Sequence, residues 1–113
     1  MKALLQDDRV HALIDHGAKD LVVVNNNAGT GDVGLAALIR RRRVRKMICS
    51  FPRSSDPRAF HELYNAGEIE LEVVPQGTLA KRLRAGGSGV RAFFTRASVG
   101  TPFDRKTAAQ EPL

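Results

Sequence analysis

The 113-residue sequence contains no tryptophan and only one cysteine, Cys49. A single cysteine excludes an intramolecular disulfide and a zinc site built mainly from cysteines. The longest uninterrupted apolar run covers only residues 35–39, whereas a membrane-spanning helix needs about 20 predominantly apolar residues. The acidic pair Asp7 and Asp8 close to the amino terminus is atypical of a secretory signal. We therefore expect a reduced, soluble and cytoplasmic chain without a membrane partner.

The remaining composition is typical of a folded domain. Hydrophobic residues make up 42% of the chain and charged residues 27%, a balance that favours a globular over a disordered state. The length fits a single domain, since domains most often contain roughly 100–150 residues.

Positive charge is in excess, because 18 lysine and arginine residues oppose 12 acidic residues and leave a formal net charge of +6. Six of these bases lie in the segment from Arg40 to Lys46, at the carboxyl end of a helical pattern. Cations are favoured there because they face the negative end of the helix dipole. A basic RNA-binding module is an alternative, but no aromatic residue for base stacking lies within this run. We interpret the run as a solvated helix end and expect no nucleic-acid partner.

Helical and strand patterns alternate along the chain. Asp8 is placed to cap a first helix, and Asp56-Pro57 is a start signal for another. The pattern predicts helices at residues 8–16, 33–39, 57–66 and 78–85, and strands at Leu21–Val24, 45–50, 68–73 and 90–95. The first strand has the continuous apolar character of a buried parallel strand, while the third alternates and should lie near an edge. The order predicts an α/β fold with an open, mainly parallel sheet and crossover helices.

Polar and glycine-rich segments follow each predicted strand. Ligands of open parallel sheets bind beyond the carboxyl ends of the strands. We therefore expect the loops at residues 25–31, 50–56, 75–78 and 95–100 to lie at one edge of the sheet.

A glycine motif in the first of these loops suggests an alternative function. Residues 29–34 read GTGDVG, which satisfies the G-x-G-x-x-G pattern of nicotinamide-dinucleotide-binding turns. Three asparagines and an alanine separate the strand from Gly29, whereas the pattern requires the first glycine at the end of the strand. The acidic residue expected about 20 residues further on is also missing, although Arg53 could meet a phosphate. Nicotinamide binding through Gly29–Gly34 remains the alternative hypothesis.

Together these segments resemble the alpha chain of the family I 3-oxoacid CoA-transferases, enzymes built from alpha and beta subunits. The matching strings are LVVVNNNAG (21–29), GLAAL (34–38), VRKMICS (44–50), EIELEVVPQGTLA (68–80) and RAGGSGVRAFFT (84–95). The resemblance runs in one register from about His11 to Thr95. The string CSFPR at residues 49–53 is most similar to the 3-oxoadipate branch.

The resemblance implies a reaction shared between the two kinds of subunit. In the family, a glutamate of the beta subunit performs a nucleophilic attack on an acyl-CoA thioester and forms an acyl-glutamyl anhydride, which CoA then converts into a glutamyl-CoA thioester. An acceptor carboxylate takes over the CoA by the reverse steps. The resemblance therefore implies a CoA-transferase that acts on an acyl-CoA such as succinyl-CoA and a 3-oxo acid such as 3-oxoadipate. It implies no separate cofactor and no metal.

The resemblance also points to residues that bind substrate or CoA. Asn26 and Asn27 fall on the family's paired asparagines and Gln76 on its Pro-Gln-Gly glutamine, while Gly77, Gly89 and Phe93 fall on loop glycines and an aromatic. An amide can donate to a developing oxyanion without placing a second charge beside the nucleophile. Both asparagines could equally brace the loop backbone, and a threonine at position 78 could cap the following helix. The chain is expected to hold no catalytic residue, since the nucleophilic glutamate belongs to the beta subunit.

The chain departs from the family pattern at both ends. The family's opening strand and glycine loop would precede the first helix, where residues 1–9 leave no room, and the family continues beyond Thr95. We therefore expect a truncated alpha subunit that is inactive alone and functions as part of an oligomer with the beta subunit. In this interpretation residues 1–96 form a partial CoA-transferase domain, and residues 97–113 form a polar, poorly ordered tail.

Overall fold

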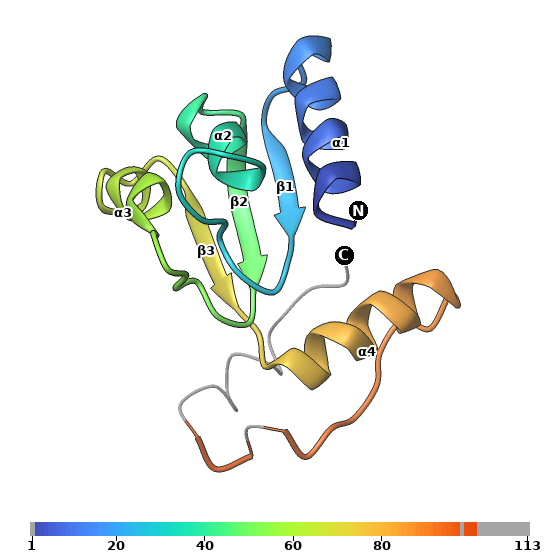
Figure 1. The fold of residues 1–113 in the computed structure, drawn as a ribbon. Coiled ribbons are helices and arrows are strands. Elements are labelled where there is room, and N and C mark those ends of the chain that lie inside the picture. The colour runs from blue at the N-terminus through green and yellow to red at the C-terminus, as the bar shows by residue number, and fades with distance from the viewer. Residues whose placement is uncertain (1, 98, 102–113) are drawn as a thin grey trace. The chain divides into compact units, whose positions relative to one another are not determined.

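The computed structural model describes residues 2–97 and 99–101, and the side chains from residue 8 onward (Figure 1). The chain divides into two compact units, Met1–Val73 and Val74–Leu113, and each is described by itself. The elements of the first unit are α1 (Lys2–His16), β1 (Leu21–Val24), α2 (Leu35–Arg40), β2 (Val44–Cys49), α3 (Arg58–Asn65) and β3 (Glu70–Val73). The second unit contains α4 (Gln76–Gly87).

The first unit is built on a parallel sheet with β2 in the centre. Its strand order is β1-β2-β3, and both neighbours run parallel to β2. The register pairs Val24 with Ile48, and Cys49 with Val73. The predicted α/β fold with an open, mainly parallel sheet is therefore confirmed, and the third predicted strand lies at an edge.

The helices of the first unit share one buried cluster with one face of the sheet. Helices α2 and α3 contact each other, and Figure 1 shows both on the same side of the strands. Right-handed crossovers between parallel strands added in one direction place their helices on one face in this way. Val10 and Ile14 of α1 pack against the same cluster.

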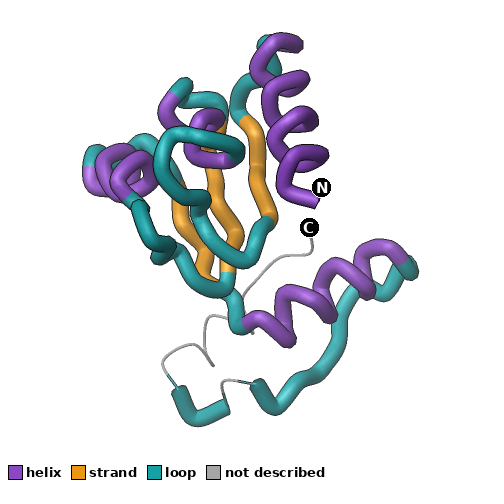
Figure 2. Tube along the Cα trace, viewed as in Figure 1, coloured by secondary structure: helices purple, strands orange, loops and turns teal. Residues whose placement is uncertain are grey.

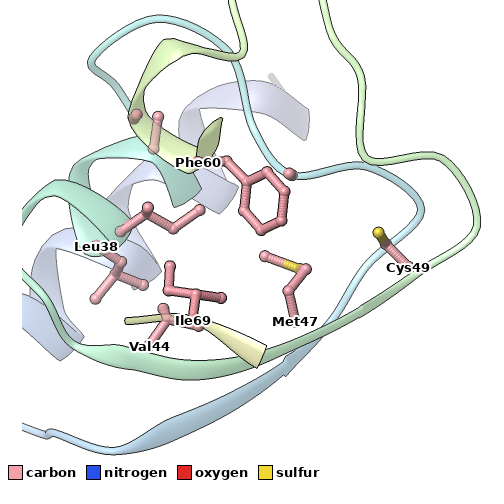
Figure 3. Packing of buried hydrophobic residues seen from close by; sticks show 10 residues of the cluster. Leu38, Val44, Met47, Cys49, Phe60 and Ile69 are labelled. Atoms are coloured by element: carbon pink, nitrogen blue, oxygen red, sulfur yellow. The ribbon is translucent and has the colours of Figure 1, made fainter. Parts of the chain in front are cut away.

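The core lies between α2, α3 and the inward face of β2. Phe60 of α3 is 1% exposed and Met47 of β2 is fully buried. Figure 3 shows Phe60 and Leu38 pointing toward the side of the sheet that carries Met47 and Ile69. Cys49 is fully buried here, and desolvation raises the pKa of its thiol. The cysteine therefore serves as a small hydrophobic residue.

The opposite face of the sheet carries apolar and charged residues. Val22 and Val24 are 42% and 37% exposed, so the expectation that β1 is buried on both faces is wrong for this structure. The reason is that the helices of the first unit all pack on the other face, where Val23 lies. Along β2, Lys46 forms ion pairs with Glu70 (2.9 Å) and Glu72 (3.0 Å), and hydrogen bonds to these carboxylates raise the pKa of Lys46.

Every base of the run from residue 40 to 46 has a partner within the chain. The partners are the Asp32 carboxylate for Arg40, the Ala37 carbonyl for Arg41, the Glu68 carboxylate for Arg42, the Gly17 carbonyl for Arg43, the Asp20 carbonyl for Arg45, and two glutamates of β3 for Lys46. The bonds from Arg43 and Arg45 tie the turn before β1 to the start of β2. These contacts give the run a structural role, which for Arg43 and Arg45 lies at the amino-terminal edge of the sheet.

Helix α1 begins earlier than the sequence pattern predicts. We expected Asp8 to cap it, but the helix starts at Lys2, so Asp8 lies inside it. The preceding residues include alanine and two leucines, which have high helix propensity and extend the helix.

The second unit differs from its prediction at two points. Helix α4 begins at Gln76, directly after Pro75, so Thr78 lies inside the helix and is buried rather than capping it. The predicted strand at residues 90–95 is wrong, because this segment is irregular and forms no ladder with β1, β2 or β3 in the described residues. A strand pattern becomes a strand only when a neighbour accepts its backbone hydrogen bonds. Phe94 within it is fully exposed.

Two further expectations concern membranes and the carboxyl terminus. Among the described residues, no helix is both long and apolar enough to cross a bilayer. Most of the polar tail expected at residues 97–113 lies outside the described residues.

The core predicts a large difference between two phenylalanines. Replacing Phe60, which is buried against Met47, with alanine should lower the free energy of unfolding by about 3 kcal/mol or more, because it leaves a cavity. The matched control is Phe51→Ala, since Phe51 is 62% exposed and its loss should cost less than about 1 kcal/mol. Urea denaturation followed by circular dichroism measures both, and equal losses would contradict this description of the core.

Candidate functional site

The loops that follow β1 and β2 leave the same edge of the sheet (Figure 2). This is the carboxyl edge, where ligands of open parallel sheets bind. The backbone N–H of Asn25 donates to the carbonyl of Ile48 at 3.0 Å, so strand pairing continues to the start of the first loop. Of the four loops expected at one edge, the two at residues 25–31 and 50–56 lie together within the first unit. The other two belong to the second unit.

Four hydrogen bonds join these two loops, which we call the loop clasp. They run from Phe51 N–H to Asn26 O (3.0 Å), from Ser50 Oγ to Asn26 O (3.2 Å), from Ser54 Oγ to Gly29 O, and from Gly31 N–H to Asp56 O (3.0 Å). The clasp fixes the backbone of the first loop at three successive points. Side chains on both loops therefore project from a braced edge.

The structure separates the roles of the adjacent asparagines. The side-chain oxygen of Asn27 accepts a hydrogen bond from Gly29 N–H at 2.9 Å, and its backbone carbonyl accepts one from the Asn25 amide at 3.1 Å. Asn27 is thus engaged in bracing the loop. Asn26 is exposed, and within the described residues its side chain has no hydrogen-bond partner. Of the three asparagines in this loop, Asn26 is the one whose amide is available to a ligand.

Gly29 has a steric role in the turn from β1 into α2. Its φ angle is +83°, and a Cβ at this position would lie 2.8 Å from the backbone nitrogen of Ala36. Only glycine fits so close an approach. Gly29 also lies five positions beyond Val24, the last residue of β1, so the first glycine is not at the strand end as nucleotide-binding turns require. The glycine motif is explained by loop geometry, and the nicotinamide alternative gains no support.

Opposite charges are paired on this edge, with one exception. Arg58 binds the Asp56 carboxylate through two hydrogen bonds of 2.8 Å, which hold the pKa of Asp56 at about 2. Asp32 is paired with Arg40. Arg53 is exposed and, in the part of the chain that the structure describes, forms neither a hydrogen bond nor an ion pair.

Apolar side chains are also exposed at this edge. Phe51, on the loop after β2, is 62% exposed, and Val33, two residues before α2, is 65% exposed. The sequence pattern indicated Arg53 only as a phosphate contact and gave no functional role to Phe51 or Val33. For Phe51, the available signal was its position directly after the second strand.

The remaining predicted site residues lie in the second unit. Gln76 and Gly77 are exposed and form the first turn of α4, whose positive dipole end favours anions. Gly89 has a φ of +70° in the turn that ends this helix, and Phe93 is half-buried. Contact of these four residues with a ligand stays a prediction.

No group of three or more metal-ligating side chains gathers anywhere in the described part of the chain. Within these residues the edge offers a neutral amide, a cation and apolar surface. Such a set can bind a carboxylate or a thioester carbonyl through the amide and an anion through the cation, with apolar contact between them.

Comparison with known proteins places this chain beside CoA-transferases. The family model for coenzyme A transferase matches residues 8–111. The chain is 55% identical over 97 residues to the alpha subunit of the 3-oxoadipate CoA-transferase of Pseudomonas putida, covering 86% of this chain and 42% of the relative. It is 52% identical over 92 residues to the same subunit of Acinetobacter baylyi, covering 81% of this chain and 40% of that protein.

A more distant relative carries a different substrate name. The chain is 42% identical over 97 residues to the alpha subunit of a probable succinyl-CoA:3-ketoacid coenzyme A transferase of Bacillus subtilis, covering 86% of this chain and 40% of the relative. The chain thus spans about two fifths of the length of these bacterial relatives.

The separate roles of the asparagines predict separate effects on stability. Asn27→Ala should lower the free energy of unfolding by about 1 kcal/mol, because Gly29 N–H loses its acceptor. Asn26→Ala is the matched control and should change it by less than about 0.5 kcal/mol, since its exposed side chain has no partner among the described residues. Urea denaturation of both variants provides the comparison, and the reverse order of effects would refute the assignment.

Proposed function

The chain belongs to the coenzyme A transferase family, and from this premise we propose that it provides part of the alpha subunit in a two-subunit 3-oxoacid CoA-transferase. The reaction would move CoA between an acyl-CoA such as succinyl-CoA and a 3-oxo acid such as 3-oxoadipate. The observation that carries the proposal is 55% identity over 97 residues to the alpha subunit of a 3-oxoadipate CoA-transferase.

The proposed chemistry divides the work between two chains. A carboxylate of the beta subunit performs the first attack, on the thioester carbonyl, and expels CoA as its thiolate, which gives an anhydride. The thiolate then attacks the glutamyl carbonyl of the anhydride and releases the first acid, so that the enzyme carries CoA. Attack by the acceptor carboxylate and return of the thiolate complete the exchange. No electron is gained or lost, and the proposal needs no separate cofactor or metal.

The role proposed for this chain is to orient the reacting carbonyl. The exposed amide of Asn26 can donate a hydrogen bond to the oxygen that becomes negative as the nucleophile adds. A neutral donor suits this position, because a cation would pair with the carboxylate nucleophile and weaken it. Asn27, Gly29 and the loop clasp hold the backbone from which Asn26 projects. Contact between substrate and Gln76, which lies in the second unit at the start of α4, is a separate proposal.

The partner that we propose is the beta subunit of a CoA-transferase, since the relatives are named as one of the subunits of such enzymes. The nucleophile would come from that partner, so the chain alone should be inactive. The need for this partner also distinguishes the proposed enzyme subunit from a binding module, which would bind its ligand on its own.

Coexpression tests the proposal directly. The chain, produced together with the beta subunit of the Pseudomonas putida enzyme, should copurify with it, and the complex should transfer CoA from succinyl-CoA to 3-oxoadipate. Size-exclusion chromatography measures the complex, and absorbance of the 3-oxoacyl-CoA product measures transfer. Each of the two proteins on its own is the control. Absence of both a complex and CoA transfer would refute the proposal.

The role of Asn26 predicts a specific loss of rate. In the active complex, Asn26→Ala should lower kcat by about 100-fold, the effect typical of removing one donor to a developing oxyanion. Asn26→Gln, which keeps the amide but moves it by one methylene, should be intermediate. Steady-state kinetics with succinyl-CoA provide the measurement, and a kcat close to that of the unaltered complex would exclude the proposed contact.

A further inference from the structure

Arg53 differs from the arginines around it. The arginines at positions 40 to 43, 45 and 58 each contact a carboxylate or a backbone carbonyl of the same unit. Asp32 and Asp56, the acids close to this edge, each form an ion pair with another arginine. Among the described residues, Arg53 therefore presents an uncompensated positive charge at the edge where Asn26 projects.

The loop clasp fixes the backbone on both sides of Arg53. Phe51 N–H is bonded to the Asn26 carbonyl at 3.0 Å, and the Ser54 hydroxyl is bonded to the Gly29 carbonyl. Arg53 lies two residues from the first contact, so its Cα is at most about 7 Å along the chain from that of Phe51. The backbone that carries the guanidinium is thus braced on both sides, within two residues of the contact with Asn26.

An exposed aromatic side chain lies in the same segment. Phe51, 62% exposed, precedes Arg53 by two residues and is hydrogen-bonded through its backbone to Asn26. The segment therefore offers the apolar ring of Phe51 and the cation of Arg53, and its backbone is bonded to Asn26, which carries the amide. This combination matches a short acyl chain with a reacting carboxyl group at one end and a second anionic group at the other.

We propose that Arg53 determines specificity by binding the distal carboxylate of a dicarboxylic acyl group whose reacting carbonyl lies at Asn26. The inference rests on the proposed function and deepens it. A guanidinium binds a carboxylate through two parallel hydrogen bonds, which favour a diacid over a monoacid of the same length. The phosphates of CoA share this anionic chemistry, so the test must separate the two sources.

A matched pair of acceptors makes this separation in the complex with the beta subunit. The acceptors 3-oxoadipate and 3-oxohexanoate have the same chain length, but only the first carries a distal carboxylate. With succinyl-CoA as the common donor, we expect Arg53→Gln to lower the ratio of kcat/KM for 3-oxoadipate to that for 3-oxohexanoate by about tenfold or more. Because donor and CoA are identical in both reactions, their contributions cancel in the ratio. Arg53→Lys should retain part of the selectivity.

The matched control is Arg9→Gln. Arg9 lies on α1, is exposed and, like Arg53, has no partner among the described residues, so the substitution removes the same charge from a helix that is not part of the loop clasp. It should leave the selectivity ratio unchanged. An unchanged ratio in Arg53→Gln would overturn the proposal. So would equal losses for both acceptors, which would indicate contact with CoA phosphate instead.

A binding measurement decides the question even if no transfer occurs. The chain labelled with ¹⁵N is titrated with succinate and with butyrate, and the amide resonances of residues 51, 53 and 54 are followed by NMR. We expect shifts with succinate that are lost in Arg53→Gln and are weak with butyrate. Equal shifts with both acids, or none with succinate, would overturn the inference. Failure of the proposed function would be distinct, since no acceptor of either kind would then be converted.

Discussion

The pairing of β2 on both of its edges is the constraint on which the first unit depends. Its inward side chains, Met47 and Cys49, are fully buried under α2 and α3, which sets the face on which the helices pack. Its register with β1 pairs Val24 with Ile48, so the two strands end within one residue of each other. The loops that follow must then lie side by side, and hydrogen bonds join them. The candidate site is therefore a direct consequence of strand register.

The same arrangement decides how the excess of positive charge is used. At the amino-terminal edge, Arg43 and Arg45 bind backbone carbonyls of the turn before β1, and thus connect segments about 25 residues apart in the sequence. At the carboxyl edge, Arg40 and Arg58 neutralise the acids of the loops. Most of these arginines in the first unit thus stabilise the turns and loops that connect helices and strands. The exception, Arg53, lies where ligands of parallel sheets bind.

Much of the fold follows from sequence pattern, and the errors have identifiable physical causes. The first two paired strands were predicted from short apolar runs bounded by polar loops, and the third from its alternation of acidic and apolar residues. The segment at residues 90–95 has a similar pattern, but it has no partner strand among the described residues and remains irregular. Helix α1 begins before Asp8 because the residues that precede Asp8 favour a helical conformation. A capping residue marks the start of a helix only where the segment before it is not itself helical.

By itself, the sequence determined the order of helices and strands, the parallel sheet and the resemblance to CoA-transferases, because these depend on local periodicity and on strings of adjacent residues. It also indicated that amides and glycines gather after the first strand. Only the tertiary structure decided that Asn27 braces the loop while Asn26 is available, and that Arg53 is unpaired within the described residues among many paired arginines. The reason is that such availability depends on partners from distant parts of the chain, such as Ser54 for Gly29 and Phe51 for Asn26, which only folding brings into contact.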